Sequence, residues 1–374
     1  MSLEQDSPSV IVASKSPVLE AKGISVVYGN RKVLDVPSLQ VMPDKVLAII
    51  GPNGSGKTTL SLCLSLLLKP TTGHIEYQGH TVPDGASILQ MRRRFAVVFQ
   101  EPLLLNTSVW DNVTMGLHLR GFKRQEIKKR AEHWLERFGI ASFSKRNSRT
   151  LSGGEAQRAS LARAFVLQPE VLFLDEPFAA LDTPTRQSLF GDMINILQET
   201  QCTTVLVTHD RNEAQTLAHR VAVILNGSIV QMGSPKEIFS SPATEDIARF
   251  VGMDNMLEGI VISNNDCVAD IDIKGYIVQG FSTCQVGGTV NVAIRPEDIT
   301  LLLSKPSSSA RNVFPGKITA TIPSGPLVRI TLDCGGFSLT ALITRMSADD
   351  LKLGIGMTVY ASFKVTAIHV IAVK

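Results

Sequence analysis

Short aliphatic or β-branched runs alternate with longer amphipathic stretches from Pro17 to about Gly233. This alternation is typical of an α/β layer structure with a largely parallel sheet. Between residues 103 and 149 the apolar spacing becomes helical, so we expect a helical subdomain at about 101–150, inserted between strands. The predicted buried strands are residues 46–50, 95–99, 171–174, 203–208 and 220–225.

The pattern changes after Gly233. Residues 234–242 contain Ser and Pro, and a short helical segment follows at 245–251. Beyond residue 254, short alternating runs separated by Gly, Asn and Asp predict a small all-β unit. We therefore divide the chain into a flexible N-terminus (1–16), a first domain (17–240), a linker (241–254) and a β-barrel domain (255–374).

The β-barrel domain contains a candidate internal sequence repeat. The segment that begins Asn255-Met-Leu-Glu-Gly is repeated in outline by Asn312-Val-Phe-Pro-Gly, and the apolar spacing of 287–299 recurs at 356–368. Two copies of a barrel-like half are one interpretation. The alternative is a chance likeness among short strands.

Composition narrows the class of protein. Apolar residues make up 44% and charged residues 19% of the chain, as in a soluble globular protein. The formal net charge is only +3 and no long run of one sign occurs, which argues against nucleic acid as a partner. Five cysteines without a CxxC pair predict reduced thiols in a cytosolic compartment. No apolar run approaches the ~18 residues that cross a bilayer, and no secretion signal is expected.

The strongest local motif is a G-x-x-x-x-G-K-[ST] phosphate loop between a predicted strand and a predicted helix. Backbone N–H groups of such a loop surround phosphate oxygens, Lys57 reaches the terminal phosphates and the Thr58 hydroxyl ligates Mg²⁺. The motif predicts binding of ATP with Mg²⁺. The predicted nucleotide-binding residues of the loop are Gly51, Pro52, Asn53, Gly54, Ser55, Gly56, Lys57, Thr58 and Thr59.

An apolar strand further along the chain ends in two carboxylates, Asp175 and Glu176. Phosphoryl transfer assisted by Mg²⁺ requires such a pair. We expect Asp175 to hold the metal, partly through water, and Glu176 to activate or orient the attacking water as a catalytic residue.

The segment Leu151-Ser152-Gly153-Gly154-Glu155 leads into a helical run. It resembles the signature of the ABC ATPase family, with Glu155 where Gln is commoner. The resemblance implies a P-loop NTPase fold with a helical subdomain. It also implies that Ser152, Gly153, Gly154 and Glu155 contact ATP held by a second copy. A helix cap without functional consequence is the alternative.

Four more residues follow the family's order over about 230 residues. The resemblance implies that Tyr28 stacks on adenine, that Gln100 senses Mg²⁺ and the γ-phosphate, and that His209 holds the γ-phosphate and the attacking water. Asp182 is expected to serve communication across the dimer. Its loop reads Ala-Ala-Leu-Asp where the family commonly has Ser-Ala-Leu-Asp.

The C-terminal domain adds a second resemblance. Residues 294–299 resemble a segment of family members that import sugars, polyamines, iron, sulfate and oxyanions. Residues 342–347 and 356–370 look like the molybdate-binding-protein (TOBE/mop) type of OB-like barrel. A tetrahedral oxyanion is expected at Thr344, Ser347 and Lys364, whose hydroxyls and cation suit it. The alternative is a barrel that serves dimerisation alone.

Together the resemblances imply a homodimeric importer ATPase at the cytoplasmic face of the cell membrane. Its partners would be two transmembrane permease subunits and, indirectly, an extracytoplasmic substrate-binding protein. Molybdate or tungstate is the first substrate hypothesis, and iron(III), sulfate, polyamine or sugar are alternatives. A non-transport ABC ATPase of DNA repair or translation, or a regulatory protein without turnover, are the alternatives of a different class.

Overall fold

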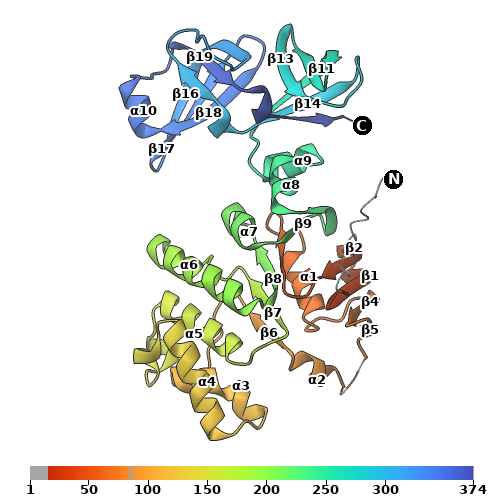
Figure 1. Ribbon diagram of the computed structural model, residues 1–374, viewed down its shortest axis with the longest axis vertical. Helices are drawn as coiled ribbons and strands as arrows, with labels where there is room; N and C mark the ends of the chain where they lie inside the picture. The colour runs from red at the N-terminus through yellow and green to blue at the C-terminus, as the bar shows by residue number, and fades with distance from the viewer. Residues whose placement is uncertain (1–15, 84, 86, 374) are drawn as a thin grey trace, which may run out of the picture. The chain divides into compact units, whose positions relative to one another are not determined.

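The computed structural model describes residues 16–83, 85 and 87–373. The flexible N-terminus predicted at 1–16 lies outside these residues except for Ser16. The chain divides into two compact units between Pro235 and Lys236. Helix α8 (Pro235–Ser240) precedes the linker predicted at 241–254, and helix α9 (Glu245–Phe250) lies within that linker (Figure 1). Because the division falls before Lys236, the predicted linker is part of the second unit.

The centre of the first unit is a six-stranded sheet made of β3 (Val46–Ile50), β6 (Phe95–Val98), β7 (Val171–Asp175), β8 (Thr203–Thr208), β9 (Arg220–Leu225) and β10 (Ser228–Gly233). Its order is β10-β9-β3-β8-β7-β6, and all neighbours are parallel except β9 and β10. All five predicted strands form. Because they run parallel, their carboxyl ends meet at one edge of the sheet.

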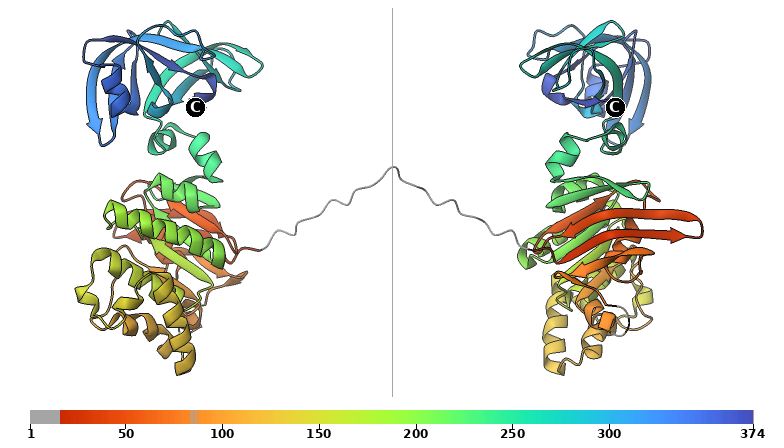
Figure 2. Two further views of the ribbon diagram at one scale, coloured as in Figure 1. Left: turned by 60° about the vertical axis from the view of Figure 1, so that its left-hand side comes forward. Right: turned by 90° about the vertical axis from the view of Figure 1, so that its right-hand side faces the viewer.

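A second, antiparallel sheet was not predicted. It consists of β1 (Leu19–Tyr28), β2 (Arg31–Val41), β4 (Thr72–Tyr77) and β5 (His80–Thr81) in the order β2-β1-β4-β5. Figure 2 shows its two long strands in red and orange. Buried and exposed residues do not alternate cleanly along β2, so its sequence lacks the period of two that identifies a half-buried strand.

The parallel sheet is covered on both faces, as alternate residues of β7 show. Val171 and Phe173 pack in a core with the antiparallel sheet and α1 (Lys57–Leu64). Leu172 and Leu174 pack on the other face against helices. These helices are α3 (Val109–Leu119), α4 (Arg124–Arg137), α5 (Gly153–Phe165) and α6 (Thr183–Thr200).

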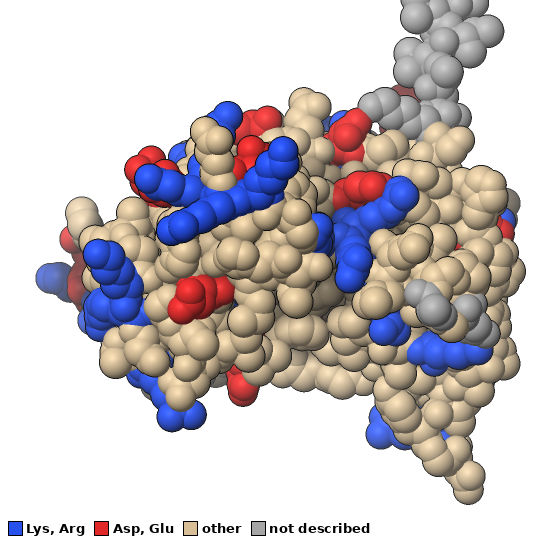
Figure 3. All heavy atoms as spheres, turned by 90° about the horizontal axis from the view of Figure 1, so that it is seen from below, with Lys and Arg blue, Asp and Glu red and all other residues tan. Residues whose placement is uncertain are grey.

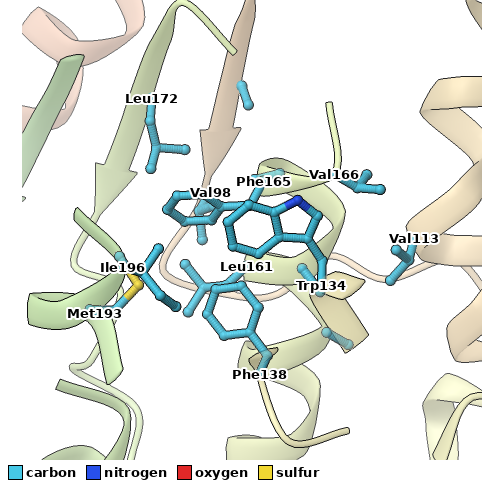
Figure 4. Packing of buried hydrophobic residues seen from close by; sticks show 14 of the residues in the cluster. Val98, Val113, Trp134, Phe138, Leu161, Phe165, Val166, Leu172, Met193 and Ile196 are labelled. Atoms are coloured by element: carbon cyan, nitrogen blue, oxygen red, sulfur yellow. The ribbon is translucent and has the colours of Figure 1, made fainter. Parts of the chain in front are cut away.

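The expected helical subdomain contains α3 and α4 and packs around an aromatic group. The ring centroid of Trp134 lies 4.9 Å from that of Phe165, and Phe138 lies 5.7 Å from Phe165 (Figure 4). Aromatic pairs at such distances contribute about 0.5–1.5 kcal/mol each beyond the burial of their area. This group fixes α4 against α5, the helix that carries the signature segment at its start.

From residue 255 onward the second unit is β-structure, as predicted, with one short α-helix among the described residues, α10 (Arg345–Asp350). One five-stranded antiparallel sheet has the order β13-β12-β11-β14-β20, and the other has the order β15-β19-β16-β17-β18. The strands are β11 (Asn255–Asn265), β12 (Val268–Ile273), β13 (Tyr276–Phe281), β14 (Thr289–Ile294), β15 (Thr300–Leu302), β16 (Asn312–Ser324), β17 (Leu327–Asp333), β18 (Ser338–Thr344), β19 (Thr358–Phe363) and β20 (Ile368–Ala372).

The two halves of this unit repeat each other in detail. Both β11 and β16 begin with a buried asparagine, and both carry a register shift at the same place, after Val261 and after Ile318. Asn255 exchanges hydrogen bonds with the backbone of Thr340 on β18, and Asn312 does so with the backbone of Gln279 on β13. Each asparagine therefore ties its own half to the other.

Among the described residues, no helix is long and apolar enough to cross a membrane. On the face seen from below, Lys and Arg side chains lie in several separate groups with Asp and Glu between them (Figure 3).

Candidate nucleotide-binding site

The phosphate loop connects β3, whose five residues are all buried, to the start of α1. A Cβ atom at Gly51 would lie 2.2 Å from the carbonyl oxygen of Ile224, so only glycine fits there. Gly56 caps α1 with φ of +103°, a backbone conformation that residues other than glycine rarely adopt. The loop therefore presents backbone N–H groups at a helix start, where partial positive charge favours an anion.

Lys57 is the buried cation of this loop, with 5% of its surface exposed. Its Nζ donates to the carbonyl oxygens of Gly51 and Pro52, each at 3.0 Å. Burial lowers the pKa of Lys57, and the charges of Glu176 and Asp175 act in the opposite direction. An anion beside the loop would therefore stabilise the charged ammonium.

A small pocket of about 280 Å³ opens at the loop. Tyr28, which is 54% exposed, lies in its wall together with Lys57 and Thr58. The hydroxyl of Ser55 is buried without a hydrogen-bond partner among the described residues. The free hydroxyl, the glycine-lined loop and the exposed aromatic ring suit a nucleotide phosphate chain and base.

Two further wall residues, Arg31 and Val33, were not predicted. They lie on β2 just after the hairpin, and Arg31 pairs with Tyr28 across the two strands. A β-hairpin predicted for residues 19–41 would have placed Arg31 and Val33 beside Tyr28. A larger cavity of about 570 Å³ lies by Lys45 and His219, at the amino ends of β3 and β9, far along these strands from the phosphate loop.

Asp175 ends β7 and faces the start of α1. The Thr58 hydroxyl donates to its Oδ1 at 3.4 Å. Burial raises the pKa of Asp175, with a smaller contribution from Glu176, while the Thr58 hydrogen bond and Lys57 lower it.

Within the described residues, no three His, Cys, Asp or Glu side chains gather as a metal cluster. A single carboxylate with a hydroxyl still fits Mg²⁺, because this ion usually keeps several waters and binds substrate phosphates alongside one or two carboxylates.

The structure brings Glu176 and His209 together. Nδ1 of His209 lies 3.1 Å from Oε1 of Glu176, with the histidine side chain 50% and the glutamate 15% exposed. Glu176 has φ of +46°, and its backbone N–H donates to the carbonyl of Val207 at 2.9 Å. This left-handed backbone is uncommon for glutamate, and such outliers concentrate at functional sites.

Gln100 lies at the same edge of the sheet. It follows β6 by two residues, and Val98 at the end of β6 pairs with Leu174, the neighbour of Asp175. Its side chain is exposed, and no hydrogen bond among the described residues joins it to Thr58 or Asp175.

The signature segment forms the start of α5. Ser152 accepts a hydrogen bond from the N–H of Glu155 at 3.3 Å, and Glu155 Oε2 accepts from the N–H of Ser152 at 2.8 Å. This reciprocal capping box shows that the segment caps α5, which does not decide whether it also contacts a nucleotide. Ser152 and Gly153 remain exposed, and none of these residues lies in the wall of the nucleotide pocket. The signature segment and the nucleotide pocket are therefore separate features of one chain.

Asp182 caps the next helix, α6. Its side chain accepts from the N–H of Thr185 at 3.3 Å, and hydrogen bonds from Thr185 lower the pKa of Asp182. A Cβ atom on Gly154 would lie 2.4 Å from Cγ2 of the same Thr185, so the signature helix and the Asp182 loop approach each other closely.

The three residues predicted to hold an oxyanion do not all meet. Thr344 caps α10, and its hydroxyl lies 2.8 Å from that of Ser347. Lys364 instead lines a separate cavity of about 640 Å³ with Thr300, Ser362 and the carboxylate residue Asp298. No contact among the described residues connects Lys364 to the other two.

Comparisons with known proteins identify what the two parts of the chain are similar to. The family model described as "ABC transporter" matches residues 34–179, and the TOBE domain model matches residues 308–370. The chain is similar to the molybdate/tungstate import ATP-binding protein WtpC of Pyrococcus horikoshii, with 38% identity over 94% of this chain and 99% of that protein.

Two further proteins are similar to this chain. The spermidine/putrescine import ATP-binding protein PotA of Legionella pneumophila shares 31% identity over 90% of this chain and 93% of that protein. A solved dimer of an ATP-binding cassette, bound to ADP and Pi after hydrolysis, matches with 27% identity and a TM-score of 0.54 over 58% of this chain and 98% of that one.

Proposed function

The chain belongs to the ABC transporter family of ATPases, and we propose that it is the ATP-hydrolysing subunit of an importer for molybdate or tungstate. The observation that carries the substrate is the 38% identity to a molybdate/tungstate import protein over 94% of this chain, so that the likeness includes both units. The observation that carries the chemistry is the placement of Lys57, Asp175 and Glu176 at the carboxyl edge of one parallel sheet.

In the proposed reaction, water attacks the γ-phosphorus of ATP and the bond to the β-phosphate oxygen breaks, which yields ADP and phosphate. The loop N–H groups and Lys57 hold the phosphate chain, and Tyr28 stacks on adenine. Mg²⁺ would be held by Thr58, Gln100 and Asp175, partly through water, and would neutralise charge on the phosphate oxygens. Glu176 orients or deprotonates the water, and His209 holds both the water and the γ-phosphate.

The proposed working form is a homodimer. One chain presents its signature segment and its nucleotide pocket as separate surfaces, and the exposed start of α5 offers the N–H of Gly153 and the hydroxyl of Ser152 to an anion. In a head-to-tail dimer they would meet the γ-phosphate held by the second copy, with Asp182 at the junction. The solved dimeric cassette supports this assembly. Two permease subunits would anchor the dimer at the cytoplasmic face of the membrane.

A polyamine importer is the second candidate, because the Legionella relative has 31% identity over 90% of this chain. Iron(III), sulfate and sugar stay open as alternatives within the importers. The names of the two curated relatives favour import over DNA repair or translation.

Uptake by cells that lack this chain tests the substrate. We expect loss of high-affinity molybdate and tungstate accumulation, measured by elemental analysis, and recovery with the wild-type chain but not with Lys57→Ala. Spermidine, sulfate and iron(III) uptake serve as parallel controls. Normal molybdate and tungstate uptake with loss of one of the controls would transfer the assignment to that substrate.

A regulatory oxyanion on the second unit stays a prediction. Calorimetric titration of molybdate, tungstate and sulfate into the full-length protein tests it, with Lys364→Ala and Thr344→Ala as separate variants because the two residues lie apart. Absence of binding would leave the barrel as a dimerisation module.

A further inference from the structure

Few contacts hold the imidazole of His209 in place. It is half exposed, and Glu176 is its one charged partner among the described residues. Its position must therefore depend on the backbone of the residues on either side, Thr208 and Asp210. Both are fixed by a compact polar network that the reaction described above does not use.

Glu213, on helix α7 (Arg211–Leu217), holds the residue before His209. The Thr208 hydroxyl donates to Oε2 of Glu213 at 2.5 Å and accepts from the backbone N–H of Asp210 at 3.0 Å. The Glu213 side chain is 6% exposed, and burial raises its pKa even though the Thr208 and Arg186 hydrogen bonds act in the opposite direction. A carboxylate so deeply placed requires a cation.

Arg186 supplies that cation from α6. Its Nη2 lies 2.7 Å from Oε1 of Glu213 and 2.7 Å from Oδ2 of Asp210. Hydrogen bonding to Glu213 raises the pKa of Arg186, so we take the guanidinium as charged and the carboxylates as its acceptors. One arginine thus binds the residue after His209 directly and the residue before it through Glu213.

The same arginine is tied to the Asp182 loop. Its backbone N–H donates to the carbonyl of Asp182 at 2.9 Å, which is the first turn of α6. The Asp182 side chain caps that turn through Thr185. A displacement of the Asp182 loop therefore moves the start of α6, and Arg186, whose Nη2 binds both carboxylates, carries the movement to Asp210 and Glu213.

We propose that Arg186 is a positioning residue that couples the Asp182 loop to His209 during ATP hydrolysis. The inference rests on the proposed function, because it assigns a role within that ATPase. Among the described residues, Arg186 has no hydrogen bond or ion pair with the phosphate loop or with Glu176. It acts through the backbone that carries His209, and it makes the position of the imidazole depend on the surface that meets the second copy.

The test measures ATP hydrolysis by the full-length protein. Arg186→Gln should lower kcat about 10- to 100-fold with KM for ATP nearly unchanged, because a displacement of about 1 Å at a reacting group costs up to ~100-fold. Arg186→Lys should recover only part of the loss, since an ammonium keeps the charge but sits on a shorter side chain than Nη2 of arginine. Arg137→Gln is the matched control. Arg137 pairs with Glu199 at the other end of α6 at 2.6 Å and has a similar exposure, and this variant should keep the wild-type rate.

A double variant separates positioning from a general loss of structure. In a His209→Ala background, Arg186→Gln should cause no further loss of kcat. An additional loss of the full size, or a wild-type kcat in the single variant, overturns the coupling. If Arg186→Gln fails to fold, Glu213→Gln replaces it in the same cycle, because the amide keeps the arginine acceptor and loses the acceptor for Thr208. A wild-type protein without ATPase activity would instead overturn the proposed function, and the coupling with it.

Discussion

Asp175→Asn should stabilise the nucleotide-free protein while it reduces the gain in stability from magnesium nucleotide. Asp175 is 8% exposed, and its side chain has one hydrogen bond among the described residues, from Thr58, which is long at 3.4 Å. Since burial is the main cause of its raised pKa, the ionised carboxylate opposes folding at neutral pH. An amide removes that charge and can still accept from Thr58. We expect a gain of about 0.5–2 kcal/mol, the usual range for a stabilising substitution.

The assay is thermal unfolding followed by tryptophan fluorescence. Both tryptophans, Trp110 and Trp134, lie in the first unit, so the signal reports the unit that contains Asp175. For a unit of this size, 1 kcal/mol shifts Tm by about 2–4 °C. Magnesium nucleotide at 100 times its Kd should add about 2.7 kcal/mol to the wild type and less to the variant, which reverses their order.

The pH dependence has a definite sign. Below the unfolded pKa of about 3.8 the carboxyl is neutral in both states, so the variant has no advantage. The advantage grows as pH rises from there through the raised native pKa, and is constant above it. Asp192→Asn is the control, because Asp192 pairs with Arg158 at 2.6 Å and its loss should lower Tm. A nucleotide-free Asp175→Asn protein that melts below the wild type at neutral pH would refute the reasoning.

Two further predictions address hydrolysis and the barrel. Glu176→Gln should bind ATP but accumulate as a closed dimer with hydrolysis reduced at least about 100-fold, which size-exclusion chromatography with ATP and phosphate release will measure; a variant that turns over like the wild type removes Glu176 from its role. Asn312→Ala leaves the N–H and C=O of Gln279 without partners, so we expect a loss of about 2–4 kcal/mol in the second unit. Calorimetry should show that transition shifted and the tryptophan transition unchanged, whereas Asn291→Ala, with one bond to Glu245, should cost less.

The sequence predicted the parts of the site that are local. The phosphate loop, Asp175 and Glu176 each follow a continuous apolar strand, and the parallel sheet then brings these strand ends together. Their meeting with His209 follows from the same topology. Arg186 could not be found in this way, because its carboxylate partners lie 24 and 27 residues away on a different helix. Which of many charged residues pair is decided by how α6 packs against α7, and periodicity contains no such information.

The barrel shows the same limit at the level of strands. The repeated Asn and Gly positions predicted two equivalent halves, and equal halves alone would suggest two separate small barrels. The structure instead pairs β14 of the first half with β20 of the second, and β19 of the second with β15 of the first. Each half would lack its fifth strand without the other, and each buried asparagine would lack its backbone partner. The two halves must therefore fold as one cooperative unit, so an effect of an anion bound near Lys364 would extend to the Thr344 side of the barrel through shared sheets. Although Lys364 lies apart from Thr344 and Ser347, binding of an anion at one place would therefore change the stability of the other.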